Sequence, residues 1–247
     1  MRKNKYYFIS DTHLGFPDHK TSLEREKKLV NFLLFAEKDA KAIYLLGDIF
    51  DFWYEYKYVV PKYYVRLLGT LAMMVDRGVE IHFFCGNHDQ WLKNYFQKEI
   101  GLIVHKAPLT IDIDGKIFFI HHGDGLNKKD WKYRLMQRLF GNKFLRFLFS
   151  ALHPRWAMAL GVYWSKISRQ SHLREENFDY QEGEQQYQFC ISYLKNHKVD
   201  YFIFGHRHLE KVWSLPYQSK LYVLSDWITS NGYFVWEGEN LEAKKFE

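Results

Sequence analysis

Short apolar runs, bounded by polar residues or glycine, alternate with longer amphipathic stretches along most of the chain. Short bounded runs are typical of buried strands, whereas apolar residues three and four apart indicate helices. We predict strands at residues 5–10, 42–46, 80–84 and 201–204. We predict helices at residues 21–39, 61–77 and 182–196. The first helix should open with a capping box of Thr21 and Glu24, and the second with Pro61.

The second half of the chain adds a hairpin and an alternating tail. Asp114-Gly115 separates apolar runs at 109–113 and 116–120, a spacing typical of a β-hairpin. Strand-like alternation returns at 220–224 and 233–236. Strands that alternate with helices and then end in antiparallel pairs predict α/β layers around a mixed sheet.

Residues 125–169 differ in kind from the rest of the chain. They carry ten Lys or Arg and one acid, Asp130, so their net charge is +9; the whole chain is +6, which leaves 6 − 9 = −3 for the remainder. Large apolar residues recur there at helical spacing, with a break at His153-Pro154. Basic amphipathic helices bind membrane surfaces or cover anionic amphiphiles. The same pattern is also typical of a helical subdomain packed on a core.

Composition restricts the class of protein without assigning a function. The chain has 247 residues, which allows one large domain or one domain with an insertion, and 47 % of them are apolar, enough for a full core. Two cysteines suggest no disulfide framework. No apolar run approaches the ~18 residues of a membrane span, and the apolar stretch behind the basic start is too short for a signal peptide. We expect a cytoplasmic protein with a core of residues 1–124 and 170–247, interrupted by an insertion at 125–169.

Five short polar motifs each follow a predicted strand. They are the segments 11–13 (DTH), 47–48 (GD), 86–89 (GNHD), 121–124 (HHGD) and 205–208 (GHRH). Open α/β sheets place their sites at the carboxyl ends of strands, so these motifs should meet. They offer oxygen and imidazole ligands from Asp11, His13, Asp48, Asn87, His122, His206 and His208. Such a mixed set suits Mn, Fe or Zn better than Ca or Mg. The alternative is that these are ordinary loop residues, but five polar clusters would then have to follow five strands by coincidence.

The motifs and their order resemble the calcineurin-like metallophosphoesterase superfamily along nearly the whole chain. The resemblance implies a β-sandwich flanked by helices and two divalent ions, manganese first among them, that share Asp48. It implies one ion held also by Asp11, His13 and His208, and the other by Asn87, His122 and His206. It further implies that His88, with an ordinary pKa near 6.5, protonates the leaving oxygen while Asp89 orients its ring.

Within this superfamily the chain is most similar to the UDP-2,3-diacylglucosamine pyrophosphohydrolases of lipid A synthesis. The size matches, segment 48–53 (DIFDFW) resembles theirs, and the insertion follows HHGD, where that family has its acyl-chain lid. The resemblance implies hydrolysis of a lipid-linked nucleotide to UMP and 2,3-diacylglucosamine 1-phosphate at the inner-membrane surface. The implied substrate-binding residues are Asp124, Ser165, Lys166 and Arg169. Trp227 could stack on the uracil ring.

One departure leaves the substrate open. Members of that family often carry Arg after the ligand Asn, where this chain has His88, the general superfamily residue. A soluble metallophosphoesterase acting on phosphoproteins, nucleotides or cyclic nucleotides is therefore an alternative. A scaffold that only binds partners would not need seven ligands. Nucleic acid is not expected, because the aliphatic bulk of the insertion suits acyl chains better than a duplex backbone.

Overall fold

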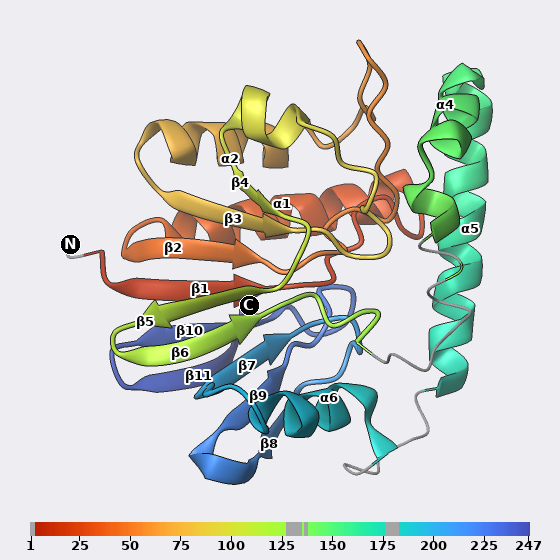
Figure 1. Ribbon diagram of the computed structural model, residues 1–247. Helices are drawn as coiled ribbons and strands as arrows, with labels where there is room; N and C mark the ends of the chain where they lie inside the picture. The colour runs from red at the N-terminus through yellow and green to blue at the C-terminus, as the bar shows by residue number, and fades with distance from the viewer. Residues whose placement is uncertain (1–2, 127–134, 136–137, 176–182) are drawn as a thin grey trace.

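The strands form two mixed sheets that pack face to face, with helices on their outer sides (Figure 1). The computed structural model describes residues 3–126, 135, 138–175 and 183–247, with the backbone alone for 169–175. The first sheet has the order β11 (Asn240–Lys245), β10 (Gly232–Glu237), β1 (Lys5–Ile9), β2 (Ala40–Leu45), β3 (Glu80–Phe84), β4 (Ile103–His105). The second has the order β5 (Leu109–Ile113), β6 (Lys116–Ile120), β7 (Tyr201–Phe204), β9 (Lys220–Val223), β8 (Lys211–Ser214). This sandwich confirms the predicted fold class.

The strand β1 shows how the two sides of the first sheet are used. Tyr6 and Phe8 face the apolar layer between the sheets, whereas Tyr7 and Ile9 face the layer under the helices. Because successive side chains alternate between the two faces and both faces are covered, the strand is a continuous apolar run. Its parallel pairing with β2 sets the carboxyl ends of both strands side by side.

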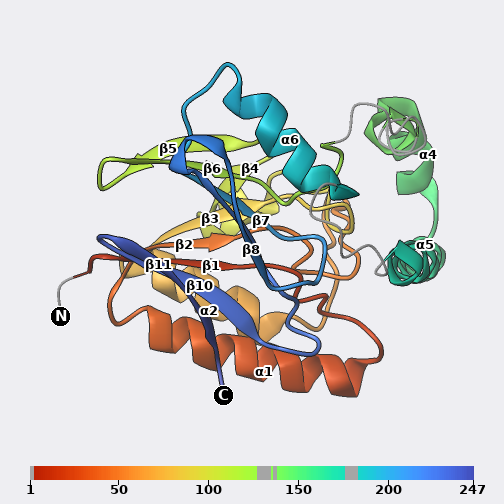
Figure 2. The ribbon, with the colours of Figure 1, turned by 90° about the horizontal axis from the view of Figure 1, so that it is seen from below.

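Helices cover the outer faces of the sandwich (Figure 2). Helices α1 (His19–Ala36) and α2 (Val65–Asp76) share one apolar cluster with the first sheet. Helix α6 (Gln185–Leu194) shares another with the second sheet. The start predicted for this helix at residue 182 lies outside the described residues.

Several predicted element ends are wrong, for local reasons. Helix α1 is capped by Asp18, whose side chain accepts from the Thr21 backbone N–H, so Thr21 lies in the first turn and forms no capping box. Helix α2 begins at Val65 and leaves Pro61 in the preceding loop. Strands β4, β8 and β11 and a π-helix at Phe96–Ile100 were not predicted.

Helices α4 (Lys143–Ala151) and α5 (Pro154–Glu175) stand across the end of the sandwich toward which β1, β2 and β3 point (Figures 1 and 2). The break predicted at His153-Pro154 is confirmed, and α5 continues past residue 169, where the insertion was expected to end. Part of this unit packs on the core, since Phe149 and Ala157 cluster with Tyr54 and Trp91. None of the helices in the described ranges is long and apolar enough to cross a membrane.

Candidate metal centre

Sharp backbone turns directly after the strands present the predicted ligands. Five of these residues have a positive φ, a region that residues other than glycine rarely adopt: Asp11 (55°), His13 (42°), Asp48 (51°), His206 (73°) and His208 (54°). Each such residue costs of the order of 1–3 kcal/mol, which the surrounding fold must offset. The concentration of this strain at one end of the sandwich indicates a functional site.

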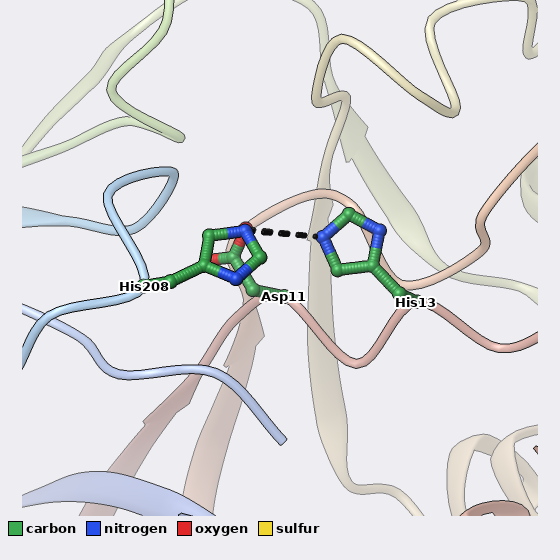
Figure 3. A group of neighbouring side chains, drawn as sticks. All are labelled: Asp11, His13 and His208. Atoms are coloured by element: carbon green, nitrogen blue, oxygen red, sulfur yellow. Dashed lines mark hydrogen bonds and ion pairs between the residues drawn. The ribbon is translucent and has the colours of Figure 1, made fainter. Parts of the chain in front are cut away.

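The first group of ligands joins the loop after β1 to the loop after β7. Figure 3 shows the side chains of Asp11, His13 and His208 turned toward one another. The Asp11 Oδ1 atom lies 3.4 Å from His208 Nε2 and 3.7 Å from His13 Nε2. The two Nε2 atoms are 3.3 Å apart. One carboxylate oxygen and two imidazole nitrogens therefore converge on a single point, as a divalent ion requires.

The second group joins the loop after β2 to β6 and β7. Asp48, His122 and His206 place one ligand atom each within 4.8 Å of one another. The Asp48 Oδ2 atom lies 3.4 Å from His122 Nε2 and 3.8 Å from His13 Nε2, a member of the first group. Asp48 thus stands between the two groups, where a shared carboxylate would be needed.

Buried polar atoms without partners support a cation at this position. Within the described part of the chain, Asp11 Oδ1, His122 Nε2 and Asn87 Oδ1 are buried and have no hydrogen-bond partner. Leaving buried polar atoms unsatisfied is costly and uncommon in folded proteins. The unsatisfied atoms are of the type that binds a divalent ion, and two of them belong to the converging groups. The residues present therefore fit a two-ion site.

Two of the ligand histidines, His122 and His208, are oriented by acceptors at their Nδ1 atoms. The Nδ1 atom of His122 lies 2.6 Å from the carbonyl oxygen of Leu46. The Nδ1 atom of His208 lies 3.5 Å from Asp226 Oδ2. Among the described residues His13 Nδ1 has no such partner: it lies 3.6 Å from Asp51 Oδ1, too far for a hydrogen bond. Acceptors at Nδ1 favour the tautomer that leaves Nε2 free to bind a metal.

Sequence reasoning missed the orienting role of Asp226 and of Arg25. The Nη1 atom of Arg25, on α1, donates to the carbonyl oxygens of Thr12, His13 and Phe16 at 3.2, 3.1 and 2.9 Å. A buried guanidinium on three carbonyls fixes the loop that carries the first ligands. Arg25 lies outside the five ligand motifs, so nothing in the sequence marks it as part of the site.

The buried carboxylates and imidazoles of the site shift one another's pKa values, as the members of ion pairs do. Burial opposes ionisation of Asp48, but the neighbouring His122 and His88 outweigh it and hold the pKa of Asp48 well below its ordinary value. Burial likewise opposes protonation of His122, yet the charge of Asp48 raises the pKa of His122 well above the usual range. The site therefore favours positive charge beside Asp48, which a bound cation would supply.

Glycines allow these loops to approach each other. A Cβ atom on Gly86 would overlap the Asp48 carboxylate and lie 2.6 Å from the Asp48 backbone nitrogen. A Cβ atom on Gly205 would overlap the Ser10 hydroxyl and lie 2.7 Å from Asp11 Oδ2. The glycines of the GNHD and GHRH motifs thus leave the room that the ligand carboxylates occupy.

His88 lies beside the cluster but is buried more deeply than expected. Its Nε2 atom is 4.0 Å from Asp48 Oδ2, and its Nδ1 atom is 3.0 Å from the carbonyl oxygen of Asp51 and 2.9 Å from Ser165 Oγ. Burial lowers its pKa to about 4, so the expected ordinary value is wrong. The Asp51 carbonyl and the Ser165 hydroxyl therefore contact the His88 ring in the way that we expected of Asp89.

Asp89 instead ties two ligand loops together. Its Oδ1 accepts from the Gly86 backbone N–H at 2.7 Å, and its Oδ2 accepts from the Ile49 backbone N–H at 2.9 Å. Burial, together with the nearby charge of Asp48, raises its pKa to about 7. Asp89 therefore fixes the separation of the loops that carry Asp48 and Asn87.

The predicted substrate-binding residues are dispersed. Asp124 and Ser165 are buried near the cluster, Lys166 is exposed on α5, and the side chain of Arg169 lies outside the described residues. The predicted stacking of Trp227 on uracil is wrong. This ring is 1 % exposed, packs on Phe32 and donates to a backbone carbonyl, so it belongs to the core.

Comparison with known proteins decides the family. The pattern of the calcineurin-like phosphoesterases matches residues 5–210. The chain belongs to this family. It is 40 % identical to a UDP-2,3-diacylglucosamine hydrolase of Porphyromonas gingivalis, over 99 % of this chain and 98 % of that protein. Proteins of the same name from Aeromonas salmonicida (30 % identical, covering 92 % of this chain and 88 % of theirs) and Actinobacillus succinogenes (28 %, covering 91 % and 92 %) are also similar.

Membership of the calcineurin-like phosphoesterases agrees with the chemistry of the site. The family match and the buried Asp and His groups together make the chain a metal-dependent hydrolase. The donor set suits two divalent ions.

Proposed function

We propose that this chain hydrolyses the diphosphate of UDP-2,3-diacylglucosamine and releases UMP and 2,3-diacylglucosamine 1-phosphate. The observation that carries the proposal is the 40 % identity with the P. gingivalis hydrolase of that substrate, because the match covers 99 % of the chain and so includes the insertion. A diphosphate with two acyl chains needs cations at its reacting end and apolar surface at the other. The end of the sandwich that carries the ligands also carries α4 and α5 (Figure 1).

In this proposal the ligand residues hold two divalent ions. Asp48 is shared; Asp11, His13 and His208 complete one site, and Asn87, His122 and His206 complete the other. Imidazole together with carboxylate favours manganese, iron or zinc, of which we propose manganese. Bound ions of this kind lower the pKa of water and neutralise charge on the phosphoryl group.

His88 is the proposed proton donor to the leaving oxygen. The carbonyl oxygen of Asp51 can only accept, so His88 Nδ1 carries a hydrogen and Nε2 is the atom turned toward the substrate. Since burial holds its pKa at about 4, the ring must take up its second proton together with an anionic substrate, whose charge favours the imidazolium. His88→Ala should therefore keep metal affinity and lose turnover.

The insertion, residues 125–169, is the proposed acyl-chain and membrane-surface element of the protein. Large apolar side chains remain exposed on α4, on α5 and at Leu152 between them; those on the helices include Phe144, Leu145, Phe147, Leu148 and Trp156. The same two helices carry the basic residues Lys143, Arg146, Arg155 and Lys166. Apolar groups beside cations match a lipid with an anionic head, and the same combination suits the cytoplasmic surface of the inner membrane. Asp124, Lys166 and Arg169 remain the proposed contacts to the polar part of the substrate.

The test is UMP release from UDP-2,3-diacylglucosamine by purified protein with Mn2+, with Asn87→Ala as the control. Efficient turnover that the control loses would support the proposal. Activity on a small chromogenic diester without UMP release would instead show a phosphoesterase of other specificity, acting on a phosphoprotein, nucleotide or cyclic nucleotide.

A further inference from the structure

Ser165 lies at the point where the helical insertion meets the metal cluster. Although it belongs to α5, its side chain is 5 % exposed, and its Oγ atom is 2.9 Å from His88 Nδ1. The two residues are 77 positions apart in the chain. This contact therefore couples the insertion to the loop that carries His88.

The close packing of α5 on the core fixes the position of the Ser165 hydroxyl. Ala157, Gly161 and Ser165 follow each other at intervals of four and so share one face of the helix, and all three are buried. Ala157 packs in the cluster of Tyr54 and Trp91, and a Cβ atom on Gly161 would overlap the ring of Phe52. The helix thus approaches the core so closely that only small side chains fit. Ser165 is held by the docking of the whole helix and has a short side chain with little freedom of its own.

The chemistry of the contact restricts the His88 ring. The Asp51 carbonyl at 3.0 Å requires a hydrogen on Nδ1, so Ser165 Oγ acts there as a second acceptor of the same N–H. Two acceptors on one N–H restrict the rotation of the imidazole more than a single acceptor does. This restriction keeps Nε2 directed toward Asp48, 4.0 Å away. With the hydroxyl removed, one acceptor is left and the ring can turn.

We propose that Ser165 is a positioning residue, whose hydroxyl holds the His88 imidazole so that Nε2 points into the metal cluster. The insertion would then complete the catalytic arrangement in addition to contacting substrate. This inference rests on the catalytic role proposed for His88, and it assigns to Ser165 a role different from substrate binding.

The test is a double-mutant cycle on a small chromogenic diester, which does not depend on the lipid substrate. Ser165→Ala should lower kcat about tenfold with KM unchanged, because a lost hydrogen bond of this kind is worth roughly a factor of ten. The same substitution in a His88→Ala background should cost nothing further. Ser150→Ala is the matched control, since it removes a hydroxyl of α4 that bonds the Phe147 carbonyl.

A spectroscopic readout makes the test independent of turnover. In the metal-free protein labelled with 15N at histidine, Ser165→Ala should shift the His88 Nδ1–H resonance, and Ser150→Ala should not. Mn2+ affinity should stay at the wild-type value in both variants.

The contrary outcomes are distinct. Losses that multiply in the double variant, or a rise in KM alone, would make Ser165 a substrate contact and overturn the inference. A full-rate Ser165→Ala beside a slow His88→Ala would overturn the positioning role and leave the role of His88 intact. A full-rate His88→Ala would refute the role of His88 itself, and the inference with it.

Discussion

Gly86 offers a substitution whose effect follows from geometry alone. It precedes Asn87 in the GNHD loop and faces Asp48, the carboxylate between the two ligand groups. Replacing it with alanine adds one methyl group and no charge. A matched control exists in Gly69, an exposed glycine on α2, where an added Cβ would meet nothing within 4 Å.

The displacement can be worked from the structure. A Cβ at Gly86 would lie 2.6 Å from the Asp48 backbone nitrogen, whereas ordinary contacts begin at 3.4 Å, so one loop must retreat by 3.4 − 2.6 = 0.8 Å. A misplacement of about 1 Å at a reacting centre costs roughly 100-fold in rate. Gly86→Ala should therefore lower kcat/KM by about two orders of magnitude. Gly69→Ala should leave activity unchanged and stabilise the fold by about 0.5–1 kcal/mol.

The assay combines hydrolysis of a chromogenic diester, calorimetric Mn2+ titration and thermal unfolding for both variants. We expect Gly86→Ala to lose Mn2+ affinity together with rate while it still unfolds cooperatively. Wild-type rate and Mn2+ affinity in this variant would refute the close approach of Gly86 to Asp48 as a requirement of the site.

Three further perturbations test other parts of the account. Replacing Phe144 and Phe147 with Ser should slow the lipid substrate at least about tenfold more than a small diester, since each exposed ring offers apolar area only to the acyl chains; equal losses on both would rule out an acyl-chain surface. Asp226→Asn should weaken Mn2+ binding about 10–100-fold in calorimetric titration, because it removes the carboxylate behind His208; unchanged affinity would exclude that role. Burial, and next the neighbouring His82, lower the pKa of His105 to about 4, so below about pH 6.5 the unfolded chain binds a proton that the folded chain does not. Stability in urea should therefore fall from pH 6.5 toward pH 4, and less so in His105→Phe; an equal fall in both would be evidence against this source.

The ligand motifs could be predicted because their signal is local. Each lies within four residues directly after an apolar run, and the parallel pairing of β1, β2 and β3 brings the ends of those runs together. The fold class follows from the same alternation of strands and helices. The exact ends of helices are harder to predict. Asp18 and Thr21 are both good capping residues, and only the backbone conformation shows which of them caps α1.

The support of the site could not be predicted, because it comes from distant parts of the chain. Asp226 approaches His208 from the loop before β10, and Ser165 approaches His88 from the insertion. No spacing in the sequence encodes those contacts. The low pKa of His88 has the same origin, since its burial depends on the packing of elements far from it in the chain. The stacking predicted for Trp227 was wrong for a related reason, because an aromatic ring with a polar edge suits both a binding site and a core.

The most direct test of the central claim is Mn2+ titration of the metal-free protein followed by electron paramagnetic resonance. The account predicts two ions per chain, with the spin-coupled signal of a pair that shares Asp48, and loss of that coupling in Asp48→Ala. One ion per chain, or two ions without coupling in the wild-type protein, would contradict it.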